Sequence, residues 1–287
     1  VRIINPCSGT IPLLTCKGQL LLSAGELYFG ASVAAVGDVN GDQYEDLLVG
    51  SPYHAGAGAA NGGAYLYFGS STGLTLWGAT DYGMPIIPPL TVAGVTSRRL
   101  VSAVGPAGDI NADGFADIVI GSPWDTYAGL YGGAFVYYGC SPSTSPGCPS
   151  TGLWGLPAYP TMGNIASVML NGPSCSGGVC QPLFFTPTGV TAATSYSSGY
   201  YWGHTVGSFG DANNDSYSDV ILGSYAIYAS CTTGACAQNY AVSGAAVLYT
   251  GGAAGLNVSP AASTVPQCAS GTCTPYLIIP SMTNWGT

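Results

Sequence analysis

The chain has 287 residues, a formal net charge of −9 and a charged fraction of only 6%. Its four basic residues, Arg2, Lys17, Arg98 and Arg99, are too few to bind nucleic acid or an anionic membrane surface. No apolar run reaches the ~18 residues that a membrane-spanning helix needs. Abundant Gly, Pro and Tyr and the lack of long helical periodicity indicate strands and turns.

The ten cysteines lie as close neighbours along the chain. Their even number, the absence of CxxC pairs and the presence of only two histidines predict disulfides rather than zinc or redox chemistry. We therefore expect an extracellular or cell-surface protein. The first residue, Val1, indicates a processed or partial chain. Sequential pairing is the simplest prediction: Cys7–Cys16, Cys140–Cys148, Cys175–Cys180, Cys231–Cys236 and Cys268–Cys273.

Taken in chain order, the predicted strands recur three times around an acidic stretch. A first strand is expected at 28–36, 99–107 and 201–209. The acidic stretches follow it as GDVNGDQYEDLLVG at 37–50, GDINADGFADIVIG at 108–121 and GDANNDSYSDVILG at 210–223. Each ends in an apolar run that predicts a second strand. A third strand is expected at GGAYLYFG (62–69), GGAFVYYG (132–139) and GAAVLYTG (244–251).

A Gly- and Pro-rich return carries a fourth segment, such as 85–92 or 275–280. Four short antiparallel strands per unit predict an all-β fold built from β-propeller blades. The units are 29–98, 99–200 and 201–284, and the second contains an insertion at about 140–200. We interpret this insertion as an elaborated surface loop, and its tract SPSTSPGCPSTG suggests O-glycosylation.

Partial units flank the three full ones within a single repeat domain, 1–287. Residues 1–28 resemble the closing segment of a preceding unit, and residues 285–287 resemble the start of a further one. Propellers close with about four to eight blades, so this pattern predicts open strand edges. Two explanations remain open. The sequence is a fragment of a longer polypeptide, or another subunit pairs with the open edges.

The acidic stretches share the spacing D-x-N-x-D-x-[YF]-x-D. Side-chain oxygens at positions 1, 3, 5 and 9, with the backbone carbonyl at position 7, supply the hard ligands that calcium prefers. Transition metals would require His or Cys, which these loops lack. The sequence thus predicts three Ca²⁺ sites, formed by Asp38, Asn40, Asp42, Tyr44 and Asp46; by Asp109, Asn111, Asp113, Phe115 and Asp117; and by Asp211, Asn213, Asp215, Tyr217 and Asp219.

These loops differ from an EF-hand, because Val49, Ile120 and Leu222 stand where its position-12 Glu would be, and a strand follows instead of a helix. Nine of the 13 acidic residues occupy predicted ligand positions in the three loops, which favours a metal. The alternative is that Asp and Asn form Asx turns without any ion.

The whole series resembles FG-GAP repeats, which form the blades of integrin α-chain β-propellers and occur in secreted bacterial proteins. Residues 65–74, YLYFGSSTGL, are similar to bacterial members in particular. The resemblance implies calcium held in the blade hairpins and a role in adhesion or surface assembly. Residues 100–101 and 223–225 depart from the family pattern. The matching elements are Phe29-Gly30 and Trp202-Gly203 for FG, and Gly50-Ser51-Pro52 and Gly121-Ser122-Pro123 for GAP.

We therefore predict an extracellular, calcium-binding FG-GAP protein with a structural or adhesive role. The low charge and Tyr-rich composition suggest the hypothesis that it is a subunit of a surface filament or other homopolymer. Expected partners are a second copy, another extracellular protein or a glycan. The alternative function is a carbohydrate-binding, lectin-like module of a larger secreted protein, since five Trp and 20 Tyr offer stacking faces.

Catalysis is not expected. His54 and His204 have no recognisable triad context, and no GxSxG motif occurs. Two N-glycosylation sequons are present, at 257–259 and 214–216. Pro260 weakens the first, and the second lies inside the third acidic loop.

Overall fold

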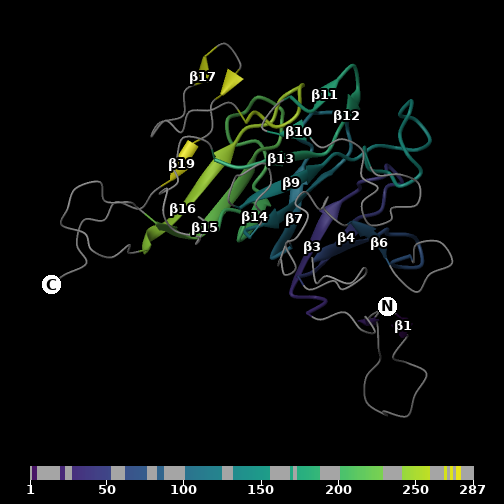
Figure 1. Cartoon of the computed structure of the whole chain (residues 1–287). Helices are drawn as coiled ribbons and strands as arrows, with labels where there is room; N and C mark the ends of the chain where they lie inside the picture. Colours follow the sequence, from purple (N-terminus) through teal and green to yellow (C-terminus); the bar gives the residue numbers. More distant parts are fainter. Residues whose placement is uncertain are drawn as a thin grey trace, which may run out of the picture.

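The computed structural model describes residues 2–4, 20–22, 28–52, 62–75, 83–86, 101–124, 132–155, 169–170, 173–187, 201–228, 241–258, 268–269, 272–273 and 276–278. These residues form strands, bridges, turns and bends (Figure 1). No helix long and apolar enough to cross a membrane occurs among them. The predicted all-β class is confirmed.

Three main sheets follow one another along the chain, as Figure 1 shows. We call them blades 1, 2 and 3. Blade 1 contains β3 (Ser32–Gly37), β4 (Asp46–Ser51), β5 (Gly63–Tyr67) and β6 (Met84–Ile86). Blade 2 contains β7 (Ala103–Gly108), β8 (Asp117–Ser122), β9 (Gly133–Tyr137), β13 (Leu183–Phe185) and β10 (Met169–Leu170). Blade 3 contains β14 (Thr205–Ser208), β15 (Val220–Tyr228), β16 (Ala241–Tyr249) and β19 (Tyr276–Ile278).

Within each blade the first four strands pair as an antiparallel meander, in the order predicted for propeller blades. Only β10 breaks the pattern, since it adds to β13 in parallel at the outer edge of blade 2. The sheets of the described residues form no closed ring.

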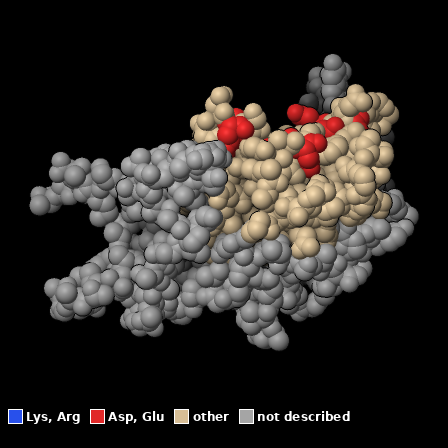
Figure 2. All heavy atoms as spheres, turned by 90° about the horizontal axis from the view of Figure 1, so that it is seen from above, with Lys and Arg blue, Asp and Glu red and all other residues tan. Residues whose placement is uncertain are grey.

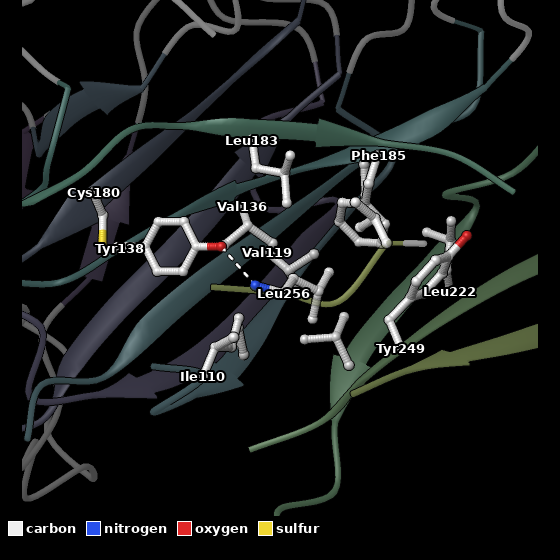
Figure 3. Packing of buried hydrophobic residues seen from close by; sticks show 14 of the residues in the cluster. Ile110, Val119, Val136, Tyr138, Cys180, Leu183, Phe185, Leu222, Tyr249 and Leu256 are labelled. Atoms are coloured by element: carbon white, nitrogen blue, oxygen red, sulfur yellow. Dashed lines mark hydrogen bonds between the residues drawn. The ribbon is translucent and has the colours of Figure 1, made fainter. Parts of the chain in front are cut away.

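Apolar clusters lie between neighbouring blades. One cluster joins residues of blade 1, including Leu48 and Leu66, to residues of blade 2, including Ile118 and Phe135. A second joins Val136 and other residues of blade 2 to residues of blade 3 (Figure 3). The middle blade is therefore covered on both faces, which explains why every residue of β8 and β9 is buried.

The insertion in the second unit is more than a surface loop, so that interpretation is corrected. Its residues 183–185 form β13, the fourth strand of blade 2, and Phe184 and Phe185 are 0% exposed. It also contains a small hairpin of β11 (Cys175–Ser176) and β12 (Val179–Cys180). The apolar run LFF at 183–185 is the sequence signal for this strand.

Two of the five predicted disulfides are formed in the described residues, Cys140–Cys148 and Cys175–Cys180. Cys268 and Cys273 face each other in the register of β17 (Cys268–Ala269) and β18 (Thr272–Cys273). Their sulfur atoms, the two remaining predicted pairs and the expected partial unit at 285–287 lie outside what is described. In the expected closing segment 1–28, β1 (Arg2–Ile4) pairs with β2 (Leu20–Leu22).

Candidate functional site

The three acidic loops connect the first and second strands of each blade, at 38–46, 109–117 and 211–219. We number each loop from its first Asp, so that position 1 is Asp38, Asp109 or Asp211. In blades 1 and 2 a β-bulge at Gly37 or Gly108 turns the first strand into the loop. Figure 2 shows that the acidic side chains of the described residues gather on one face of the molecule.

Every loop adopts the left-handed conformation at positions 4 and 6. This conformation is unfavourable for residues other than glycine, by about 1–2 kcal/mol each. Interactions within the loop must therefore maintain it. The residues are Gly41 (φ 75) and Gln43 (φ 73), Ala112 (φ 55) and Gly114 (φ 91), and Asn214 (φ 59) and Ser216 (φ 74).

The position-1 carboxylate accepts hydrogen bonds from the backbone across the loop. Asp38 accepts from the N–H groups of Gly41 at 2.7 Å, Asp42 at 3.0 Å and Gln43 at 2.7 Å. Asp109 and Asp211 accept the matching bonds from positions 5 and 6. For Asp211, these N–H donors outweigh the opposing effect of desolvation and lower the pKa of its carboxyl.

The side chains at positions 3 and 5 are held together. In loop 1 the Asn40 amide donates to Asp42 Oδ2 at 3.0 Å, while Asp42 Oδ1 accepts from the N–H of Tyr44 at 3.0 Å. Loops 2 and 3 repeat both bonds, with amide-to-carboxylate distances of 2.9 and 2.8 Å. The N–H of position 5 also donates to the position-1 carboxylate, so positions 1, 3 and 5 are connected by hydrogen bonds in each loop.

Position 9 is placed differently. Asp46, Asp117 and Asp219 are 1%, 0% and 0% exposed. One carboxylate oxygen accepts from the N–H of position 2, at 2.8–2.9 Å. The other accepts from the N–H of a glycine that follows the third strand, at 2.9–3.0 Å. The position-9 carboxylate therefore ties the loop to the third strand of its own blade.

Burial of these carboxyls raises their pKa values, although the two N–H donors act in the opposite direction. The pKa of Asp46 is raised to about 7, and those of Asp117 and Asp219 are raised as well. Negative charges at positions 1 and 5 of the same loop add to the effect.

Sequence reasoning missed the glycine partners of position 9. They are Gly69, Gly139 and Gly251, which close the repeated third-strand motif. A Cβ at any of them would overlap the position-8 carbonyl oxygen of the same blade. The signal was present as an invariable closing glycine in the three copies.

The loops also connect the blades to each other. The position-1 carbonyl of Asp38 accepts from the N–H of Ala116 at 2.9 Å, and the position-2 carbonyl of Val39 accepts from Cys140 at 3.1 Å. The carbonyls of Asp109 and Ile110 accept equivalent bonds from Ser218 at 2.8 Å and Gly252 at 2.9 Å. Loops 1 and 2 are thus each bound to the loop and the third-strand end of the next blade.

The donors suit calcium in kind, because the side chains contribute only Asp and Asn oxygens. The position-9 carboxylate, the fourth side-chain ligand of the predicted set, differs from the prediction, because both of its oxygens accept from backbone N–H groups. Within the described ranges, no group of three or more His, Cys, Asp or Glu residues is placed to hold a metal ion. Asx-type bonds are present in every loop, and they leave further lone pairs on each carboxylate available. The predicted ligand set therefore stays a prediction.

The FG-GAP repeat family matches residues 29–67 and 101–137, which span blades 1 and 2 from the first turn to the third strand. Integrin alpha-3 from Mus musculus is 34% identical over 104 residues, which are 36% of this chain and 9% of that protein. Integrin alpha-7 from Rattus norvegicus is 31% identical over 175 residues, covering 61% of this chain and 13% of the relative. Integrin alpha-IIb from Mus musculus is 34% identical over 147 residues, covering 47% and 12%.

The chain thus matches only about a tenth of the length of these relatives. Blade 3 lies outside the matched family ranges. Its acidic loop nevertheless makes the same hydrogen bonds as the loops of blades 1 and 2, so all three belong to one structural type.

Proposed function

The chain carries FG-GAP repeats similar to those of integrin α chains, and on that premise we propose that it is an extracellular protein with a structural or adhesive role, stabilised by calcium in its three acidic loops. The two disulfides, Cys140–Cys148 and Cys175–Cys180, support an oxidising, extracellular compartment. We propose no catalytic role.

The observation that carries this proposal is the threefold repetition of one loop structure. In each copy, the position-3 amide donates to the position-5 carboxylate, and the position-5 N–H donates to the position-1 carboxylate. Carboxylates this close repel one another, and a divalent cation relieves that repulsion. The ligand set we propose adds the carbonyl of position 7 and the carboxylate of position 9.

Calcium would have an architectural role here. Loops 1 and 2 are bound to the next blade through the carbonyls of their positions 1 and 2. A cation that rigidifies the loop therefore also fixes the packing of one blade on the next. Weak affinity, on the order of 10⁻⁴ to 10⁻³ M, is sufficient in the extracellular range of calcium.

Isothermal titration calorimetry of the chelator-treated chain with Ca²⁺ tests the proposal. We expect three ions per chain and a higher melting temperature when calcium is bound. Asp42→Asn should reduce the stoichiometry to two, whereas Glu45→Gln, which removes an equal charge at an exposed neighbouring position, should leave three. No binding heat and no change in melting temperature at about 5 mM Ca²⁺, well above the expected affinity range, would contradict the proposal.

The partner of such a module would be a second copy of the chain, another extracellular protein or a glycan. We include the hypothesis that the chain is a subunit of a surface filament or other homopolymer. Its low charged fraction of 6% supports this, because few charges keep neighbouring copies apart.

A group of surface aromatic side chains favours the carbohydrate-binding alternative. Tyr201 stacks on Tyr225 at 4.9 Å, and the ring of His204 meets Tyr225 edge-on at 4.7 Å. Trp124 packs against Tyr201 at 5.7 Å, and Tyr225 is 54% exposed. Exposed aromatic faces stack on sugar rings, so binding on a glycan array that is lost in Tyr225→Ala would support a lectin-like function.

A further inference from the structure

The contact between blades 1 and 2 and the contact between blades 2 and 3 repeat each other. Together they define two surfaces on every blade. We call the surface that meets the next blade in the chain the trailing face, and the surface that meets the previous blade the leading face. Within the described residues, the trailing face of blade 3 and the inner part of the leading face of blade 1 are open.

Each of these two open surfaces carries an exposed apolar side chain whose equivalents in the other blades are covered. On leading faces, Val104 lies over Gly50 of blade 1 and Val206 lies over Gly121 of blade 2. The equivalent Val33 of blade 1 is 62% exposed. On trailing faces, Val36 and Ala107 are 1% and 0% exposed, whereas the equivalent Phe209 of blade 3 is 62% exposed. Both exposed side chains occupy places that a neighbouring blade covers elsewhere in the chain.

The glycines that precede the acidic loops also show that the trailing face of blade 3 is open. A Cβ at Gly37 would lie 2.8 Å from Cβ of Ala116 in blade 2, and a Cβ at Gly108 would overlap Ser218 in blade 3. A Cβ at Gly210, the third member of this set, would meet nothing within 4 Å. The close approach of a position-8 residue is thus absent only at the trailing face of blade 3.

The backbone bonds between loops also stop at these two surfaces. In the interior contacts, the position-8 N–H donates to the position-1 carbonyl of the preceding loop. No such bond is formed by the N–H of Glu45 or by the carbonyls of Asp211 and Ala212 in the described structure. Among the described residues, the leading face of blade 1 thus has the donor, and the trailing face of blade 3 has the acceptors, of a bond that the interior contacts make.

We propose that the trailing face of blade 3 binds the leading face of blade 1 of a second copy of this chain, head to tail. This rests on the self-association included in the proposed function and names the surfaces that perform it. The two surfaces are complementary because they are equivalent to the two surfaces that meet where one blade packs on the next inside the chain. Such a contact is heterologous, so it produces chains of copies or closed rings rather than symmetric dimers.

The contact uses the inner part of the blade 1 surface. Val49, Tyr65 and Tyr67, farther out on the same face, are already buried within the chain. The contact is also weaker than those inside the chain, because Glu45 stands where blades 2 and 3 have the small residues Ala116 and Ser218. Next to Asp211 its carboxylate is unfavourable, so Glu45→Ala should tighten association several-fold.

Complementation of two variants tests the proposal by sedimentation velocity. Val33→Asp blocks one surface and Phe209→Asp blocks the other, so each variant alone should be monomeric while the wild type forms larger assemblies. An equimolar mixture should form a heterodimer of twice the monomer mass and nothing larger, because only one open pair of surfaces remains. A monomeric wild type, a mixture that stays monomeric, or variants that assemble like the wild type would each overturn the proposal.

Val179→Asp is the matched control, since Val179 is 48% exposed at the tip of the β11–β12 hairpin and should assemble like the wild type. All variants should melt within a few degrees of the wild type, because the substituted side chains are exposed. Calcium titration of the monomeric Val33→Asp chain separates the two proposals. Binding of three ions without complementation contradicts only the head-to-tail contact, and complementation without ion binding contradicts only the calcium sites.

Discussion

The substitution Asp46→Ala tests whether the position-9 carboxylate stabilises the fold without a cation. Asp46 is 1% exposed and accepts from the N–H groups of Val39 and Gly69, each at 2.9 Å. Alanine leaves both buried donors without an acceptor, and each unsatisfied group costs about 1–3 kcal/mol. We subtract part of this because a buried charge is removed as well, as the raised pKa of Asp46 indicates. A net loss of about 3 kcal/mol follows.

Urea unfolding at pH 7 in excess chelator measures this loss directly. Glu45→Ala is the control, because Glu45 is the exposed neighbour with the same charge, and surface changes of this kind stay within about 0.5 kcal/mol. Both substitutions are made in the monomeric Val33→Asp chain, so that the effect of Glu45 on association does not enter the comparison. If Asp46 acts solely as a metal ligand, Asp46→Ala would match the control in chelator and lose stability only when calcium is present. That result would refute the role in stabilising the fold that we derive from its two backbone bonds.

Three other predictions concern pH and local packing. Burial raises the pKa of Asp46 to about 7 and also raises that of Asp219, so the folded chain binds more protons than the unfolded chain between about pH 4 and 7. The metal-free protein should therefore melt at a higher temperature at pH 5 than at pH 8, and an increase towards pH 8 would contradict this. Tyr138→Phe should destabilise by about 1–3 kcal/mol, because the Tyr138 hydroxyl accepts from Ser174 at 2.6 Å and from the N–H of Leu256 at 3.0 Å; Figure 3 shows the bond to Leu256. The buried hydroxyl of Tyr137 has no partner in the described structure, so Tyr137→Phe should be neutral or stabilising in the same urea titration. Equal losses in the two variants would show that the two bonds of Tyr138 contribute nothing. Gly203→Ala should separate blades 2 and 3 and lower the melting temperature sharply, because the new Cβ would overlap the carbonyl of Gly133. Gly30→Ala is the control: Gly30 is the equivalent residue of blade 1, its Cβ would meet nothing within 4 Å, and only the conformational cost of about 1–2 kcal/mol applies. Similar melting temperatures for the two variants would refute the close approach of Gly203 to Gly133.

The blades could be predicted from the sequence because repetition multiplies a weak signal. A single run such as DLLVGS is ambiguous between a strand and a short buried helix. Three copies at the same distance from the same acidic loop remove the ambiguity, and the strand order follows from short connections. The fourth strand of blade 2 was missed because the inserted residues between β9 and β13 hide the spacing that identifies it in blade 1.

The spacing of the acidic loops predicts which side chains lie near one another but not how position 9 is oriented. In the structure, the N–H of Asp42 donates to both Asp38 and Asn40. Nothing in the spacing states whether Asp46 turns towards the loop or towards the sheet. That choice depends on the N–H of Gly69, 23 residues later in the chain and brought close only by the pairing of β4 with β5.

This placement of position 9 connects the acidic loop to blade packing, and it would connect the proposed ion binding to that packing as well. Val39 and Ile110, at position 2 of loops 1 and 2, each make both kinds of bond. The N–H of each donates to the position-9 carboxylate, and the carbonyl of each accepts from the next blade. A shift of the carboxylate towards a bound cation would move these peptides, and with them the bonds to the next blade. With the proposed calcium bound, cation occupancy in one loop would therefore be coupled to the contact made by its trailing face. In loop 3 that face is the open one, so calcium bound at Asp211, Asn213 and Asp215 should strengthen head-to-tail association, while calcium in loop 1 should act within the chain.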